Sequence, residues 1–308
     1  MDIMTDKSIV LAFDKKKADD RKTWLLESTA KEAKDLEVSY GSIKKLDITN
    51  FIHKDLVNFS LADLKRSIAH MADGLKPSQR KVMFACFHKN LKDEMKVAQL
   101  AAYVADKSSY HHGEVSLADT IVKLANDYMG SNNINLLQPC GQFGTRLMGG
   151  KDASQTRYIF TRLTKEARKI FDPRDDPILN YLDDDGRSIE PDFYMPTVPM
   201  VLINGTEGIG TGFSCYVPPF NPKDIKENIQ SRTFTNGSDK LLVLHQREKV
   251  DSLMPKAIDD WVGFVTVCRI AKFRWLKVRP VKKRLKNENS PSSVPLGHFR
   301  GLSHLSIF

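Results

Sequence analysis

The chain has 308 residues, of which 41% are hydrophobic and 28% charged, and this composition excludes a fibre or a wholly disordered protein. Its length predicts more than one domain. The formal net charge of +9 favours a polyanionic partner, either nucleic acid or an acidic membrane face, although a soluble protein that is simply basic would show the same charge.

No long apolar stretch follows a basic start at the N-terminus, and no run of about 18 apolar residues could span a bilayer. We therefore expect neither a secretory signal nor a membrane span. The four cysteines, Cys86, Cys140, Cys215 and Cys268, are widely spaced and form no C-x-x-C pair for zinc. Such cysteines are typical of buried, reduced thiols in an intracellular protein.

Residues 1–50 are charge-rich and contain a basic, helical-looking stretch without an extended core pattern. We interpret them as the end of a larger unit followed by a linker. A helix is predicted over residues 60–70, with Ser60 as its N-cap candidate, because Leu61, Leu64 and Ile68 recur at helical spacing. Asp73 and Gly74 interrupt this pattern, and Pro77 opens the next helix.

Two further amphipathic helices follow, over residues 97–104 and 117–128, and the polar turn SSYHHGE separates them. Two short helices joined by a tight turn are typical of a helix-turn-helix, although any small helical bundle offers the same pattern. Residues 132–163 then change to short apolar runs broken by glycine, which predicts a β-wing. The two parts together predict a winged-helix domain.

Beyond Arg168 the sequence alternates acidic, turn-rich loops with short apolar strands, which predicts a second, mixed α/β domain up to about residue 230. The patterning then dissolves, and nine basic residues without an acidic one accumulate between Arg269 and Lys286. That stretch is typical of a solvated tail, or of a basic tail that adds nonspecific DNA affinity. The fold class predicted for the whole chain is α/β (α+β).

Four segments carry a more specific signal, and they follow one another in order: DGLKPSQRK (73–81), SSYHHGEVSLADTI (108–121), GSNNINLLQPCGQFGTRLMGGKDASQTRYIFTRL (130–163) and PMVLINGTEGIGTGFS (199–214). Together they resemble the breakage-reunion region of eukaryotic DNA topoisomerase II, a type IIA enzyme, over about residues 10 to 230. The resemblance implies four parts: residues 1–50 as the end of a metal-binding, TOPRIM-like domain with a linker, 51–170 as a winged-helix DNA-breaking domain, 171–235 as the start of a tower-like α/β domain, and 236–308 as a divergent basic tail.

The resemblance also assigns the cleavage residues. Tyr158 matches the family's nucleophile, and a tyrosine ester conserves the energy of the broken phosphodiester, so resealing needs no activated cofactor. Arg157 matches an arginine that stabilises charge on the scissile phosphate. Adjacent residues of a strand point to opposite faces, so this pair would need a bend to converge. His111 and His112 match histidines beside the phosphate, and His112 is the better candidate for a proton relay.

A second set of residues is expected to bind DNA. Arg66, Lys76, Arg80 and Lys81 would grip phosphates, unless they form an ordinary charged helix face. The glycine-rich run at 204–212 lacks the lysine of a nucleotide-binding loop, which disfavours a nucleotide-dependent metabolic enzyme. We interpret this run as a tight turn, in which Ile209 matches a residue that wedges between base pairs.

Asp183, Asp184 and Asp185 do not follow the spacing of a calcium loop, and we interpret them as a solvated surface loop. In the family, Mg²⁺ is held by a neighbouring domain in an E-G-D-S motif and a D-x-D motif, and ATP by a separate gate. We therefore expect no metal ligands and no ATP-binding residues in this chain.

The resemblance further implies double-stranded DNA as partner, a homodimer and a nuclear location, and no membrane or small-molecule substrate. We expect a partial or mis-spliced product with a non-homologous tail. Its function is then that of a topoisomerase II fragment, an isomerase inactive by itself, or alternatively of a catalytically incomplete DNA-binding module.

Overall fold

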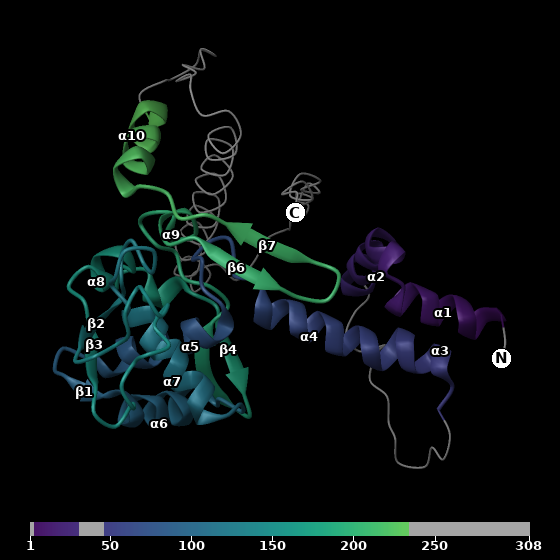
Figure 1. Cartoon of the computed structure of the whole chain (residues 1–308), viewed down its shortest axis with the longest axis horizontal. Helices are drawn as coiled ribbons and strands as arrows, with labels where there is room; N and C mark the ends of the chain where they lie inside the picture. The colour runs from purple at the N-terminus through teal and green to yellow at the C-terminus, as the bar shows by residue number, and fades with distance from the viewer. Residues whose placement is uncertain (1–2, 31–45, 234–308) are drawn as a thin grey trace, which may run out of the picture. The chain divides into compact units, whose positions relative to one another are not determined.

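The computed structural model describes residues 3–30 and 46–233, and this part of the chain combines helices with short antiparallel strands (Figure 1). Contacts divide it into two compact units. Unit 1 runs to Ala69 and also includes Thr206–Val217, whereas unit 2 comprises His70–Gly205 and continues from Pro218. The basic stretch from Arg269 to Lys286 and the expected tail at 236–308 lie outside the described residues.

Unit 1 is mainly helical. Its elements are α1 (Ile3–Phe13), η1 (Lys15–Lys17), α2 (Ala18–Ala30), α3 (Ile48–Asn50), the π-helical η3 (Phe51–Leu56), α4 (Val57–Ser67), β6 (Thr206–Ile209) and β7 (Ser214–Val217). Leu25 and Ile52 are each only 1% exposed and belong to its core. The start of the chain therefore contributes core residues, although its sequence shows no extended core pattern.

The helix predicted from residue 60 begins much earlier. Asp47 caps its N-terminus, because the carboxylate accepts hydrogen bonds from Thr49 N at 3.1 Å and Asn50 N at 3.3 Å. The chain then stays helical through α3, η3 and α4. Ser60 is buried inside this run, and its hydroxyl donates to Leu56 O at 2.7 Å, so the expectation that Ser60 is an N-cap was wrong.

The glycine-rich run of unit 1 forms the β6–β7 hairpin, which lies close to α4. A Cβ added at Gly208 would be 2.2 Å from Ser67 O, and one at Gly210 would be 2.8 Å from Leu64 Cδ2. The backbone NH and the hydroxyl of Thr211 both donate to Asp63 Oδ2, each at 3.1 Å. Glycine is thus required because the hairpin backbone approaches the helix directly.

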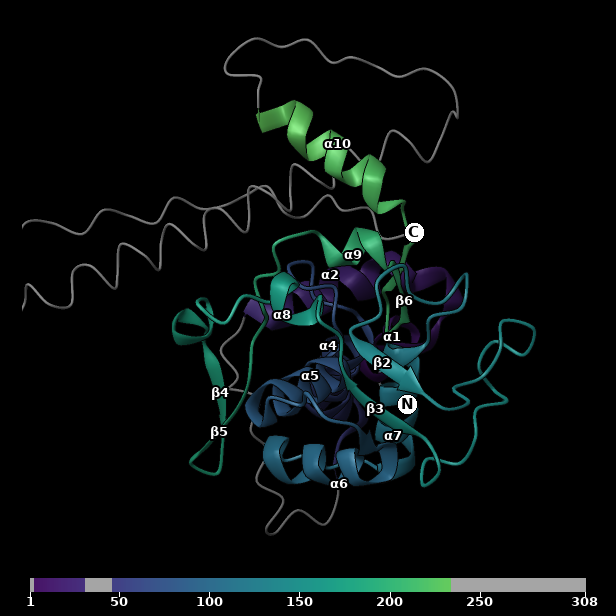
Figure 2. The same cartoon turned by 90° about the vertical axis from the view of Figure 1, so that its left-hand side faces the viewer.

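Unit 2 contains α5 (Pro77–Lys89), β1 (Met95–Lys96), α6 (Val97–Ser108), α7 (Glu114–Ala125), β2 (Leu137–Cys140) and β3 (Phe160–Leu163). The three helices pack on one another, and Figure 2 shows the strands beside them. The strands form one antiparallel sheet in the order β1–β3–β2. Val82, Leu100 and Ile121, one from each helix, are fully buried between them.

The remaining elements of unit 2 are α8 (Ala167–Ile170), η4 (Asp176–Ile178), β4 (Tyr181–Asp184), β5 (Arg187–Pro191), α9 (Met200–Ile203) and α10 (Pro222–Thr233). The acidic run that we expected in a surface loop is instead part of the β4–β5 hairpin. Asp183 and Asp184 pair with β5, and Asp185 and Gly186, with φ angles of 51° and 77°, form its two-residue turn. Asp-Gly is a favoured sequence for such a turn.

Of the three cysteines in the part of the chain that the structure describes, only Cys86 fits the expectation of a buried thiol. Cys86 is completely buried in α5, and burial raises the pKa of its thiol to about 12. Cys140 and Cys215 are half-buried, and none of the three described cysteines forms a disulfide. Cys268 lies outside the described residues. Among residues 3–30 and 46–233, no helix is both long and apolar enough to cross a bilayer.

A half-buried histidine, His70, begins unit 2. Its ring stacks on Phe193 with a centroid distance of 4.6 Å and an interplanar angle of 4°. Its Nδ1 accepts a hydrogen bond from Ala72 N at 3.2 Å, which requires an unprotonated Nδ1. Burial lowers the pKa of His70, against the opposing effect of the nearby Asp73 carboxylate.

His70 should therefore weaken the fold in mild acid. Because its pKa is lower in the folded state, the unfolded chain binds a proton first as the pH falls, so stability decreases below the unfolded pKa of about 6.5. We expect urea unfolding of unit 2 to show a smaller stability loss between pH 7.5 and pH 5.5 in His70→Asn, whose amide oxygen retains the acceptor. His88→Asn, at an exposed histidine, is the control and should match the unsubstituted chain.

Candidate functional site

Tyr158 and Arg157 lie in a turn that precedes β3, and not in a strand. Tyr158 N donates to Gln155 O at 2.9 Å, and the Tyr158 side chain is 66% exposed. The Arg157 guanidinium lies 5.1 Å from the centroid of the Tyr158 ring. The turn thereby supplies the bend that a regular strand would lack, so the two adjacent side chains converge.

This turn is held by the N-terminus of α6. Val97 N donates to Ile159 O at 3.0 Å, and Ala98 N donates to Thr156 O at 3.2 Å. The two bonds bracket Arg157 and Tyr158, and the Ile159 side chain, 1% exposed, anchors the end of the turn in the core. The tyrosine hydroxyl is thus accessible while its backbone is fixed, which suits a positioned nucleophile.

A hydrogen bond also holds the arginine. Arg157 Nε donates to Gln155 Oε1 at 2.8 Å, and Arg157 Nη2 donates to the same oxygen. Both residues are exposed. The guanidinium therefore lies beside the tyrosine ring with two of its donors directed at one neutral acceptor.

His111 and His112 lie in the turn between α6 and α7. His111 Nε2 is 3.4 Å from Asp184 Oδ2, and the His112 ring makes an edge contact with Tyr110 at 5.4 Å. Both imidazoles are exposed. Within the described residues, no hydrogen bond or ring contact joins either histidine to Tyr158 or Arg157. The structure thus brings the tyrosine and the arginine together but shows no contact between them and the histidines.

Two of the expected DNA-binding cations are engaged inside unit 2. Arg80 is 5% exposed; its Nε donates to Asp73 Oδ2 at 2.8 Å and its Nη2 to Asp73 Oδ1 at 3.1 Å. Lys81 Nζ lies 2.8 and 2.9 Å from the two carboxylate oxygens of Glu190 and also donates to Ser108 O. An ammonium has three donors, and these three acceptors account for them.

The other two cations are placed differently. The backbone N of Lys76 donates to Gln79 Oε1 at 2.9 Å at the start of α5, and its side chain is half-buried. Arg66 is exposed in the last turn of α4, which belongs to unit 1. The basic set predicted from the sequence is therefore divided between two units.

Ile209 ends β6 and is 77% exposed, a large fraction for an aliphatic side chain. It pairs in register with Ser214 of β7, and the loop between them closes with a bond from Gly210 N to Phe213 O at 2.9 Å. The hairpin thus presents an apolar side chain to solvent next to its tip, on the support that α4 provides within unit 1.

Sequence reasoning missed three acidic residues that organise unit 2. Asp73 is completely buried and accepts bonds from Arg80, from Leu75 N at 2.9 Å and from Tyr194 N at 2.9 Å. Glu190 is 3% exposed and pairs with Lys81. Asp184 lies against His111. Of the three, only Asp73 could have been found from the sequence, because its basic partner, Arg80, lies seven residues later in the same DGLKPSQRK segment.

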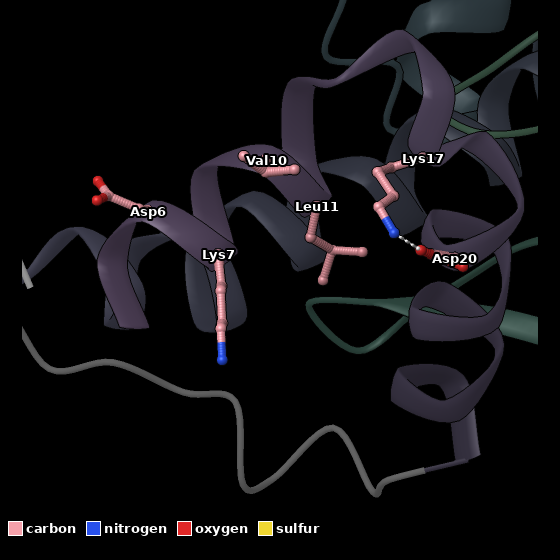
Figure 3. A pocket seen from close by; sticks show the side chains of 6 residues that line it. All are labelled: Asp6, Lys7, Val10, Leu11, Lys17 and Asp20. Atoms are coloured by element: carbon pink, nitrogen blue, oxygen red, sulfur yellow. Dashed lines mark hydrogen bonds and ion pairs between the residues drawn. The ribbon is translucent and has the colours of Figure 1, made fainter. Parts of the chain in front are cut away.

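Residues 3–30 and 46–233 contain no cluster of three or more histidine, cysteine or acidic side chains that could hold a metal ion. Figure 3 shows a pocket of about 420 Å³ in unit 1, lined by Asp6, Lys7, Val10, Leu11, Lys17 and Asp20. Lys17 Nζ points to Asp20 Oδ2 at 2.7 Å, so the pocket's charges are partly paired. None of the predicted site residues lines it.

Comparison with known proteins agrees with the resemblance in the sequence. A family model for the A subunits of DNA gyrase and topoisomerase IV matches residues 66–246, and one for the C-terminal associated domain of TOPRIM matches residues 1–64. The first match covers more than half of the chain, which therefore belongs to the DNA gyrase/topoisomerase IV family of A subunits.

Within that family, the similar proteins are eukaryotic DNA topoisomerases 2. The chain is 55% identical to DNA topoisomerase 2 of Saccharomyces cerevisiae over 226 residues, which is 73% of this chain, and 52% identical to DNA topoisomerase 2-alpha of Homo sapiens over 246 residues, or 78%. It spans 16% of the length of each. The solved DNA-binding, cleavage and re-ligation domain of Plasmodium falciparum topoisomerase II matches with a TM-score of 0.66 and 48% identity, over 76% of this chain and 31% of that one.

The burial of Arg80 leads to a stability prediction. Arg80→Met would leave the Asp73 carboxylate buried without its charged partner, and we expect a loss of about 3–5 kcal/mol in the free energy of unfolding. Urea denaturation would measure it. Arg174→Met is the matched control, because Arg174 pairs with Asp172 at the surface with 89% of its side chain exposed, and should leave the midpoint unchanged. Equal midpoints for the two variants would show that the Asp73–Arg80 pair does not stabilise the fold.

Proposed function

We propose that the chain is the DNA-breaking part of a eukaryotic-type DNA topoisomerase II, an ATP-hydrolysing isomerase that cuts and rejoins both strands of a duplex. The observation that carries this proposal is the exposed Tyr158 beside the Arg157 guanidinium, on a turn fixed to α6, in a chain of this family. The similar Plasmodium structure is a DNA-binding, cleavage and re-ligation domain, which supports the same role.

The reaction balances as a transesterification. Tyr158 Oη attacks the phosphorus, a bond forms between that oxygen and the 5′ phosphate, and the bond to the 3′ oxygen breaks. A neutral phenol is a weak nucleophile, so its attack needs a base that takes the proton, and we assign this role to His112, or to His111 beside it. The departing 3′ oxygen takes up a proton, and the reverse steps reseal the strand.

Arg157 supplies positive charge to match the charge that the phosphate develops. Its guanidinium already lies beside the Tyr158 ring, and an arginine can bind two phosphate oxygens through two parallel hydrogen bonds. Preorganised donors of this kind stabilise a transition state without reorganising during the reaction. In the longer family members Mg²⁺ would assist the leaving oxygen, and ATP would drive the cycle.

The architecture fits this role. Helices α5, α6 and α7 followed by the β1–β3–β2 sheet support a winged-helix domain within residues 51–170, with residues 171–235 as the start of a tower-like α/β domain. Residues 1–50 would complete a TOPRIM-like, metal-binding domain, and residues 236–308 form the divergent tail. We further propose a homodimer acting on nuclear DNA.

The DNA contacts fall into two classes. Arg66 and Lys76 would bind phosphates, and the exposed Ile209 would wedge between base pairs and bend the duplex. Arg80 and Lys81, which are bound to Asp73 and Glu190, would hold α5 in place within unit 2 and not grip phosphates directly.

A second candidate function is a DNA-binding module without catalysis. The observation that favours it is the lack of an E-G-D-S motif, in which the family holds its metal. Covalent capture of DNA separates the two candidates, because both of them bind duplex DNA and only the first forms an adduct.

Duplex binding should depend steeply on salt and weakly on sequence. Each phosphate that a lysine or arginine neutralises contributes about 0.9 to the slope of log K against log salt concentration. We expect Arg66→Gln and Lys76→Gln each to lower this slope by about 1 in fluorescence anisotropy, and Arg174→Gln to leave it unchanged. A slope near zero for the unsubstituted chain would contradict binding to the DNA backbone.

Covalent capture should require a metal-competent partner. We expect the chain alone to form no DNA adduct with Mg²⁺ and ATP, and to form one when mixed with a full-length relative whose own tyrosine is replaced by phenylalanine. The amount of labelled DNA that remains bound to this chain after denaturation measures the covalent adduct.

The control for this experiment is Tyr158→Phe, which removes the hydroxyl and keeps the ring. An adduct that persists in this variant would exclude Tyr158 as the nucleophile. An adduct formed by the chain without a partner would show that the chain itself can provide the metal site.

A further inference from the structure

The turn that carries His111 and His112 is held at several points by residues from α5 and the β4–β5 hairpin. The turn begins where α6 ends, at Ser108, and Ser109 has a φ of 46° in the left-handed region. Tyr110 N closes the helix by donating to Ala105 O at 3.2 Å. The position of the His111–His112 turn therefore depends on the residues that fix the last turn of α6.

Lys81 provides the first hold. Its ammonium donates to the carbonyl of Ser108, one of the last helical carbonyls of α6, which have no partner within the helix. A cation there also interacts favourably with the negative end of the helix dipole. Both carboxylate oxygens of Glu190, at 2.8 and 2.9 Å, fix the ammonium to β5. Ser108 is completely buried and Glu190 3% exposed, so water hardly competes.

Asp184 provides the second hold, at the end of β4. Its carboxylate lies 3.4 Å from His111 Nε2. A hydrogen bond from the Ser109 side chain lowers the pKa of Asp184, and His111 adds to this effect. The Asp184 carboxylate therefore lies against the first histidine of the turn, independently of the Lys81 contact.

We infer that Lys81, Glu190 and Asp184 form a clamp that positions the His111–His112 turn for proton transfer. Lys81 and Glu190 fix the end of α6, and Asp184 fixes the histidine side of the turn. This inference rests on the proposed function for its catalytic part. The three members are positioning residues, since none of them is placed at the reacting atoms.

Two members of the clamp, Asp184 and Glu190, lie on the β4–β5 hairpin. The β4–β5 hairpin carries both carboxylates: Asp184 pairs with Arg187, and Glu190 lies at the β-bulge that precedes the Tyr181–Pro191 pair. Strand β5 also contacts α5 and α6. A displacement of about 1 Å in a catalytic group can cost on the order of 100-fold in rate, so a rigid support has a direct chemical consequence.

The first test uses the histidine signals of the whole chain in ¹H–¹³C NMR spectra, with His111→Gln and His112→Gln to assign them. We expect Lys81→Met and Asp184→Asn to move the His111 and His112 signals and to leave that of His53, in unit 1, in place. Lys81→Arg and Asp184→Glu should restore them. A global loss of structure would move every signal. Unchanged His111 and His112 signals in both variants would overturn the clamp.

Asp185→Asn is the matched control, because Asp185 carries the same charge one residue along, is exposed, and occupies the turn with a φ of 51° that asparagine tolerates. Its spectrum should match that of the unsubstituted chain. Movement of the His111 and His112 signals equal to that in Asp184→Asn would show that charge alone, and not contact, affects the turn, and would overturn the role of Asp184.

The second test is DNA capture with the tyrosine-dead partner. We expect Lys81→Met and Asp184→Asn to lower adduct yield at short times by about 100-fold, and the conservative variants to recover most of it. Normal yield despite moved signals would overturn the catalytic part of the inference. Moved signals with no adduct from the unsubstituted chain would support the clamp and refute the proposed function.

Discussion

The buried carboxylate of Asp73 is the interaction on which the packing around α5 in unit 2 depends. It accepts bonds from the Arg80 guanidinium and from the backbone NH groups of Leu75 and Tyr194. A buried carboxylate is costly unless its oxygens are satisfied, and these donors satisfy them. The turn that starts α5 is thereby joined to a segment far along the chain, because Tyr194 is separated from Asp73 by 121 positions.

A basic sequence does not by itself define a basic surface. The DGLKPSQRK segment contains three cations, Lys76, Arg80 and Lys81. Arg80 is buried against Asp73, and the donors of Lys81 are directed at Glu190 and Ser108. Both belong to α5, which supports the histidine turn. If the chain binds DNA as proposed, the electrostatic attraction would have to come from other cations, because Arg80 and Lys81 are already bound to buried acceptors within unit 2.

Much of the helical part could be predicted, and the reasons for the failures are local. The spacing of Leu100 and Val104 indicated α6 correctly, because a buried helix face leaves a periodic signal. Asp47 was missed as a cap because Ser60 was taken as the start of the helix, although Ile48, Phe51, Ile52 and Leu56 already recur at helical spacing. The turn at Phe51–Leu56 is π-helical, which changes the repeat. The acidic β4–β5 hairpin was missed because charge concealed its Asp-Gly turn.

For the site, Tyr158 and Arg157 were assigned through resemblance, and nothing in the dipeptide indicated that a turn would bring them together. The clamp carboxylates could not be predicted, since each meets its partner across a long separation in sequence: 109 positions for Lys81 and Glu190, and 73 for His111 and Asp184.

The side-chain amide of Gln155 holds the Arg157 guanidinium by hydrogen bonds. Arg157 Nε and Nη2 share one neutral oxygen, Gln155 Oε1. A phosphate group offers two anionic oxygens to the same pair of donors, so each N–H would obtain its own acceptor and a stronger bond. Exchanging the amide for phosphate frees Gln155 to turn to solvent, where it is already exposed. On the proposed function, a DNA phosphate would therefore replace Gln155 as the partner of Arg157, and the guanidinium would stay hydrogen-bonded before and after the substrate binds.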